Sequence, residues 1–128
     1  MTAPVWIEEA VRAFGRQMGL GSFALNERGA AGVRFENGVA LRLEYSMESL
    51  VMTAGVAMEP TAAALTRLLT GAHPDAAPGA NVRAAWMERT GEGIYVIRLA
   101  ERLVDVSSLE AAFRCLWTLA TRLGKAVS

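Results

Sequence analysis

The dipeptide Asn37-Gly38 constrains the fold of this chain more than any other feature of its sequence. An Asn-Gly pair favours the backbone angles of a tight two-residue turn, and alternating apolar residues on both sides make it the strongest local signal for a β-hairpin. Val33 and Phe35 precede the pair, and apolar residues stand at every second position from Val39 to Tyr45. The sequence therefore predicts two antiparallel strands joined at this turn.

Three further strands are expected after this hairpin. Leu50–Val56 carries apolar residues at odd and even positions, which predicts a strand with apolar neighbours on both faces. Val82–Met87 and Ile94–Leu99 are joined by the turn-forming run Thr90-Gly91-Glu92-Gly93, which predicts a second hairpin. Gly21–Gly32, before the first strand, is expected to be irregular. Successive hairpins imply an antiparallel sheet of about five strands.

Two helices are expected on either side of the first three strands. Ile7, Val11, Phe14 and Met18 lie three or four residues apart, which predicts an amphipathic helix near the N-terminus. The second helix is expected over Thr61–Thr70. Its surface carries almost no charge, whereas a solvated helix normally carries more, so we expect it to pack on two sides.

The last helix begins near Ser107 and Glu110, whose spacing predicts a capping box. Its apolar stripe comprises Leu109, Ala112, Phe113, Leu116, Trp117, Ala120 and Leu123. His73–Gly79 is rich in Pro, Ala and Gly and is expected to be a loop. The elements follow the order α-β-β-β-α-β-β-α, which predicts one α+β domain over residues 1–128 with three helices packed on the sheet.

Charge and hydropathy exclude several classes of protein. Thirteen basic residues balance thirteen acidic ones, which argues against a nucleic-acid binder or a polybasic membrane-surface protein. The arginines are scattered among acids, and no basic and aromatic block stands out. No run approaches the ~18 apolar residues of a membrane span. The first twenty residues lack the pattern of a secretory signal, so we expect a cytoplasmic protein.

The sequence predicts no catalytic site, metal site or cofactor. His73 and Asp75 stand two residues apart, but no nucleophile or pocket is indicated beside them, so a surface-loop histidine is favoured. Cys115 lies next to an apolar stripe, where an inert buried side chain is favoured over a reactive thiol. Glycine-rich phosphate loops are missing, and Lys125 is the only lysine. The chain is therefore not expected to be an enzyme.

Apolar surface is the feature that remains. The first two helices and the third and fourth strands offer more of it than a small domain readily buries, which favours self-association and a peptide-binding groove. Met47, Met52 and Met58 cluster around the third strand. Flexible Met side chains suit a surface that accepts several sequences, although ordinary core packing explains them equally well. For Trp6, Trp86 and Trp117, core packing is favoured over exposed anchors.

Several segments resemble the class I type III secretion chaperones. These are Ala13–Leu20, Phe23-Ala24-Leu25, Val33-Arg34-Phe35-Glu36 and Val39–Tyr45 in the first half, and Ile94–Ile97, Leu103–Leu109 and Trp117 in the second. The resemblance covers nearly the whole chain. Two features depart from the family pattern. Members are usually acidic, whereas this chain is neutral. Their middle helix ends on a Leu-Leu-x-x-Asn-Leu type of sequence, whereas here it ends on Leu68-Leu69-Thr70-Gly71-Ala72.

The resemblance implies a small bacterial cytoplasmic homodimer without enzymatic activity. It would bind the N-terminal chaperone-binding segment of a secreted effector and keep it extended, soluble and competent for secretion, and the secretion ATPase is a further candidate partner. Carried onto this chain, the effector contacts are Val11, Phe14, Val33, Phe35, Leu43 and Met52. The dimer contacts are Leu65, Leu68, Leu69, Val82 and Trp86.

Two other classes stay open at this stage. A structural adaptor, an α+β module that scaffolds a larger complex, would bind a folded partner instead of an extended segment. A small enzyme whose reactive group comes from its substrate or cofactor would need a polar pocket that the sequence does not indicate.

Overall fold

We describe the chain from a computed structural model, which covers residues 2–73 and 81–127. The first helix, α1, spans Val5–Gln17, and strands β1 (Ala30–Arg34), β2 (Ala40–Ser46) and β3 (Ser49–Ala57) follow it. After them come helix α2 (Ala62–Gly71), strands β4 (Val82–Met87) and β5 (Glu92–Ala100), the short helix η1 (Glu101–Leu103) and the long helix α3 (Val106–Val127). The predicted order of helices and strands and the α+β class are confirmed.

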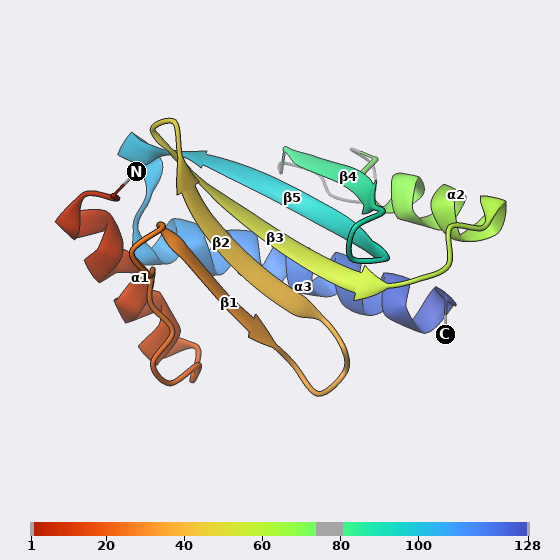
Figure 1. Cartoon of the computed structure of the whole chain (residues 1–128), viewed down its shortest axis with the longest axis horizontal. Helices are drawn as coiled ribbons and strands as arrows, with labels where there is room; N and C mark the ends of the chain where they lie inside the picture. The colour runs from red at the N-terminus through yellow and green to blue at the C-terminus, as the bar shows by residue number, and fades with distance from the viewer. Residues whose placement is uncertain (1, 74–80, 128) are drawn as a thin grey trace.

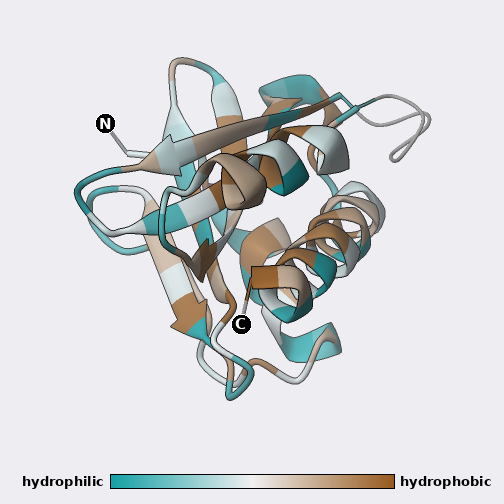
Figure 2. Ribbon diagram, turned by 90° about the vertical axis from the view of Figure 1, so that its right-hand side faces the viewer, coloured by the Kyte–Doolittle hydropathy of each residue, from teal (hydrophilic) through white to brown (hydrophobic). Residues whose placement is uncertain are grey.

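The sheet is antiparallel throughout, with the strand order β1-β2-β3-β5-β4. Figure 1 shows α3 running along one face of the sheet, with α1 at one end of the molecule and α2 at the other. Figure 2 shows the ribbon by hydropathy, and hydrophobic and hydrophilic bands alternate along the strands. This alternation follows from the two-residue period of a strand, which turns successive side chains to opposite faces.

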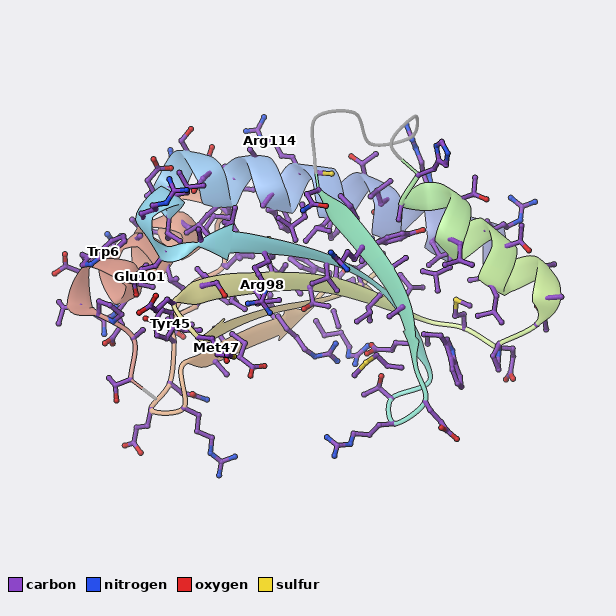
Figure 3. The ribbon with its side chains drawn as sticks, turned by 90° about the horizontal axis from the view of Figure 1, so that it is seen from above. Trp6, Tyr45, Met47, Arg98, Glu101 and Arg114 are labelled. Carbon is purple, nitrogen blue, oxygen red and sulfur yellow. The ribbon has the colours of Figure 1, made fainter. Side chains whose placement is uncertain are left out.

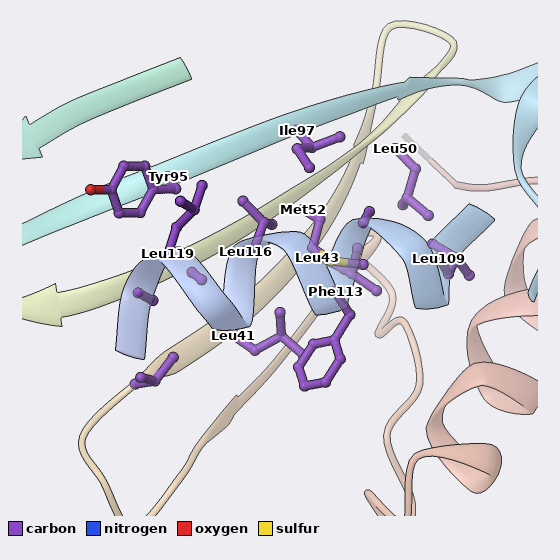
Figure 4. Close-up of a cluster of buried hydrophobic side chains, with 14 of the residues drawn as sticks. Leu41, Leu43, Leu50, Met52, Tyr95, Ile97, Leu109, Phe113, Leu116 and Leu119 are labelled. Atoms are coloured by element: carbon purple, nitrogen blue, oxygen red, sulfur yellow. The ribbon is translucent and has the colours of Figure 1, made fainter. Parts of the chain in front are cut away.

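The core lies between α3 and one face of the sheet. Leu41 and Leu43 of β2 and Leu50 and Met52 of β3 are at most 1% exposed and face the helix. In Figure 4 they lie opposite the stripe of α3, of which Leu109 and Leu116 are completely buried. This interface between helix and sheet is therefore a major source of the hydrophobic free energy of folding, and buried residues of α1 and α2 extend the same core.

The predicted Asn37-Gly38 hairpin is present, with Gly38 at a φ of 92°. Its first strand begins at Ala30, so the expectation of an irregular segment up to Gly32 is wrong by three residues. The side chain of Asn26 explains the early start, because its Oδ1 accepts hydrogen bonds from the backbone of Arg28 and Ala30 and turns the chain into the sheet.

Two other predictions differ from the structure. The turn between β4 and β5 is shorter than predicted, since Glu92 and Gly93 already pair as strand residues and Gly91, at a φ of 67°, closes the turn. The third strand has a helix on one face only. Val51 and Thr53, on its other face, are partly exposed, so the described residues of this chain supply the predicted apolar cover on one face only. The predicted loop His73–Gly79 lies outside the described residues apart from His73.

Candidate functional site

Strand β1 is an edge of the sheet, and its register shows which backbone groups are free. Phe35 N–H donates to the carbonyl of Val39, and Tyr45 N–H donates to that of Gly29. Because hydrogen-bonding positions alternate along an antiparallel pair, the odd-numbered residues of β1 bond to β2. The backbone groups of Gly32 and Arg34 therefore point outward, where another strand could pair with them.

The outward groups at the start of β1 are already occupied. Asn26 N–H donates to the carbonyl of Ala30 over 2.8 Å, and Ala30 N–H donates to Asn26 Oδ1 over 3.1 Å. The free stretch of this edge is consequently limited to Gly32 and Arg34.

An aromatic cluster lies directly behind this edge. The ring of Phe35 meets that of Trp117 edge to face at 4.8 Å and that of Phe113 at 6.2 Å, and Phe113 in turn meets Phe14 at 5.9 Å. Phe35, Trp117 and Val33 are partly exposed. The edge thus combines free backbone hydrogen-bonding groups with an apolar surface that side chains of an added segment could cover.

The six predicted effector contacts fall into two groups. Val11, Phe14, Leu43 and Met52 are at most 1% exposed, so they build the core and present no surface to a partner in the folded chain. Sequence periodicity identifies apolar positions but does not separate covered ones from uncovered ones. Val33 and Phe35 are the two that remain accessible.

The predicted dimer contacts lie together on α2 and β4, which pack against each other. Leu69 is 63% exposed and Leu65 and Trp86 are partly exposed, whereas Leu68 and Val82 are buried. The indole N–H of Trp86 is buried without a hydrogen-bond acceptor among the described residues. The surface-accessible part of this group is therefore Leu65, Leu69 and Trp86.

A third apolar surface, which sequence patterns did not indicate, lies at the end of the molecule where α1 begins. Val5, Trp6, Met47 and Leu103 are each between 47% and 79% exposed, so the prediction that Trp6 packs in the core is wrong. They come from the start of α1, the turn between β2 and β3, and η1, which lie at the same end of the molecule in Figure 1. The turn is costly, because Met47 and Glu48 hold positive φ angles of 50° and 59° that side chains disfavour. Neither residue is the Asn or Gly that would have indicated such a turn.

Hydrogen bonds hold η1 against this turn. Glu101 N–H donates to the carbonyl of Glu48, and the hydroxyl of Tyr45 donates to Glu101 Oε1. That second hydrogen bond, with burial, raises the pKa of Tyr45 to about 12, because deprotonation would remove the donated proton and place a second negative charge beside Glu101. Figure 3 shows Tyr45 and Glu101 beside each other.

The described residues offer little reactive chemistry. Burial raises the pKa of the Cys115 thiol, which suppresses the nucleophilic thiolate. No cluster of three metal-ligating side chains occurs within residues 2–73 and 81–127. His73 is exposed, and Asp75, its predicted neighbour, lies outside the described residues. None of the described helices is long and apolar enough to cross a membrane.

A family model covers nearly the whole chain, and solved structures share its fold. Residues 6–123 match the model for the type III secretory system chaperone SycN. The solved ExsC-ExsE complex contains a similar chain, with 19% identity, a TM-score of 0.78, and coverage of 99% of this chain and 97% of that one. No curated protein sequence matches the chain.

Two further complexes contain the same fold. The ExoU-SpcU complex of the type III secretion system of Pseudomonas aeruginosa aligns at 16% identity and a TM-score of 0.69, covering 92% of this chain and 98% of that one. The Yersinia pestis type III secretion chaperone SycH, in complex with a fragment of YscM2, aligns at 17% identity and a TM-score of 0.69, covering 91% and 98%.

Proposed function

Because this chain belongs to the type III secretory system chaperone family, we propose that it binds the N-terminal segment of a type III secreted effector and keeps that segment soluble and competent for secretion. The observation that carries the proposal is the family match over residues 6–123, nearly the whole chain. The solved structures support it, because the similar chains in the ExoU-SpcU and SycH-YscM2 structures are each part of a complex with another protein.

The edge of β1 is the place where such a segment would bind. An extended client adds its backbone to the free groups of Gly32 and Arg34, while its side chains cover Phe35 and Trp117. Binding of this kind needs no chemical step. The chain is accordingly proposed to act without enzymatic activity, in the bacterial cytoplasm, where effectors are made.

Self-association completes the proposal. The exposed Leu69 and the partly exposed Leu65 and Trp86 form an apolar surface on α2 and β4 that a second copy of the chain would cover. A dimer would then present two β1 edges to one client. The secretion ATPase remains a further candidate partner of the loaded chaperone.

Co-expression tests the proposed function. The chain is produced together with an effector encoded beside its gene, and the pair is purified through a tag on the effector. A soluble complex that elutes as one species supports the proposal, and aggregation of the effector in the presence of the chaperone contradicts it. A folded effector domain that binds while its N-terminal segment stays free would instead favour a structural adaptor.

A pair of substitutions at Gly32 tests the binding edge. Gly32→Pro removes an outward N–H without breaking the ladder to β2, and an edge strand tolerates proline at such a position. Gly32→Ala is the matched control, since its Cβ meets nothing closer than 3.5 Å and the N–H stays. We expect Gly32→Pro to weaken client binding by roughly tenfold, the effect of about one hydrogen bond, and Gly32→Ala to leave it unchanged. Calorimetric titration measures both, and equal affinities would place the client elsewhere.

A further inference from the structure

The face of the sheet opposite α3 carries no helix of the described chain. In Figure 3 the helices lie above or beside the sheet, and side chains such as Arg98 extend from its other side. The strand registers assign side chains from all five strands to this open sheet face. Many positions of its floor carry small residues, among them Ala30, Gly32, Ala40, Thr53, Gly55, Ala85 and Ala100.

The open sheet face is positively charged although the chain as a whole is neutral. Its charged residues are Arg34, Arg42, Arg83, Arg98, Glu44 and Glu92, four arginines against two glutamates. The chain as a whole has thirteen basic and thirteen acidic residues. The fold therefore separates charges that the sequence distributes evenly.

One of the two glutamates is buried within this face. Glu92 is only 2% exposed, with Arg42 Nη1 at 3.0 Å from its Oε1 and Arg34 Nη2 at 3.8 Å from its Oε2. Gly55 makes room for the carboxyl group, since a Cβ there would lie 3.3 Å from Glu92 Cδ. Two guanidinium groups thus share one buried carboxylate, and one positive charge is left uncompensated.

Both arginines remain accessible while they hold Glu92. The side chain of Arg34 is 61% exposed and that of Arg42 is 42% exposed. A guanidinium has five N–H donors in a planar fork, so each can bind a second carboxylate from outside.

The other two arginines have no carboxylate partner on the described part of the chain. Arg98 Nη1 donates to Ser49 Oγ over 2.7 Å, and Ser49 Oγ donates to the carbonyl of Ser46, so the guanidinium is oriented without being neutralised. Arg83 forms no ion pair with a described residue.

Apolar surface accompanies these charges. A hollow of about 450 Å³ opens on this face, lined in part by Gly32, Val51, Thr53 and Ile94. Met87, at its rim, is 41% exposed. A helix or strand with one apolar side could lie on this floor, and its polar flanks would then reach the arginines.

We infer that the open sheet face docks an acidic, amphipathic segment of the client effector. This inference rests on the proposed function and adds a second contact to it, distinct from the β1 edge. Carboxylates of the segment pair with Arg83 and Arg98 and with the free donors of Arg34 and Arg42. Its apolar side chains cover Val51, Ile94 and Met87. Charge complementarity selects the segment, because neutral or basic stretches would leave the guanidinium groups unpaired.

The test uses fluorescent peptides that tile the N-terminal region of the effector that co-purifies with the chain. Fluorescence anisotropy gives the dissociation constant of each peptide for the wild type, for the Arg83→Glu/Arg98→Glu double variant and for Arg114→Glu. Arg114 is the matched control, because it is an exposed arginine on the outer side of α3 (Figure 3). Light scattering and thermal unfolding of each variant check assembly and folding.

We expect the tightest acidic peptide to lose about tenfold in affinity for the double variant, and as much when its Asp and Glu are replaced by Asn and Gln. Arg114→Glu should bind like the wild type. The inference would be overturned if Arg114→Glu lost as much peptide affinity as the double variant, or if the double variant lost none. Conversion of the double variant to a monomer would overturn it as well. Heparin binding that matches the peptide in affinity and in arginine dependence would also overturn it.

Failure of the inference and failure of the proposed function give different results. If a client binds the wild type and the double variant equally, only the docking inference fails. If no client co-purifies, the proposed function fails. The open sheet face is then tested with a designed peptide of alternating Leu and Glu and with a control peptide in which Gln replaces each Glu. Equal affinities of those two peptides would overturn the charge selectivity of this face as well.

Discussion

Two glycines in helices, Gly71 and Gly124, differ sharply in the space around them. A Cβ on Gly71, at the end of α2, would overlap the hydroxyl of Tyr95 and lie 2.9 Å from its Cζ. A Cβ on Gly124 in α3 would meet Val56 Cγ1 at 3.5 Å, an ordinary contact. Tyr95 is 1% exposed, so it has little freedom to move away. The missing side chain at position 71 is therefore required for the packing of α2 against β5.

These glycines give a matched stability prediction. Gly71→Ala should lower the free energy of unfolding by about 1–3 kcal/mol, the usual cost of overpacking. Gly124→Ala should raise it by roughly 0.5–1 kcal/mol, because alanine favours a helix interior over glycine. Urea denaturation followed by circular dichroism measures both changes. A destabilised Gly124→Ala, or an unchanged Gly71→Ala, would contradict this account of the packing.

At the scale of the element, the start of α3 shows how a sequence motif can be shifted along the chain. Ser107 and Glu110 predict a capping box, but the structure places the cap at Asp105, so that prediction is wrong by two residues. Asp105 Oδ1 accepts the N–H of Ser108 over 2.7 Å, and Asp105 N–H donates to Ser108 Oγ over 2.9 Å. The reciprocal bonds of a capping box are thus present, with serine in the place of the usual glutamate.

This assignment predicts the effect of two substitutions at one helix end. Asp105→Ala removes the acceptor of the cap and should lower the free energy of unfolding by about 1 kcal/mol. Ser107→Ala touches an exposed residue outside the cap and should change it by less than ~0.5 kcal/mol. Thermal unfolding of the two variants decides between the two capping schemes, because the order of their melting temperatures reverses if Ser107 is the cap.

The elements that sequence patterns predict well are those with strong local signals. The Asn37-Gly38 turn, the stripe of α3 and the strand β4 lie where they were expected, because turn chemistry and periodicity are local. The tight turn at Met47-Glu48 was not predicted, since neither residue favours a positive φ and the pairing of β2 with β3 imposes it. The cover of each apolar face depends on tertiary packing, which local patterns do not contain.

At the scale of the whole molecule, burial separates the two leucines that follow each other on α2. Leu68 is 1% exposed and belongs to the core, whereas Leu69 is 63% exposed and points away from it. The family resemblance implies that both are dimer contacts. Their different burial follows from the 100° between successive helical residues. The same substitution at the two positions therefore separates an effect on the dimer from an effect on folding.

We therefore expect Leu69→Asp to shift the protein from dimer to monomer with little change in stability, because the charge lies in solvent once the copies separate. Leu68→Asp should instead unfold the chain, since a buried unpaired charge costs several kcal/mol. Light scattering at micromolar concentration measures the mass, and circular dichroism measures the fold. A monomeric wild type would refute the proposed dimer, and a dimeric, folded Leu69→Asp would move the interface away from α2.

The hydrogen bonds between Asn26 and Ala30 bear on how long a client stays bound. They leave only two residues of β1, Gly32 and Arg34, with open backbone groups, so strand addition gains at most four hydrogen bonds there. At about 1 kcal/mol each, these amount to a dissociation constant on the order of 1 mM for the edge alone. A strand bound this weakly dissociates quickly. A client held by several weak contacts can therefore be released one contact at a time. A short binding edge therefore suits a chaperone that must release its client.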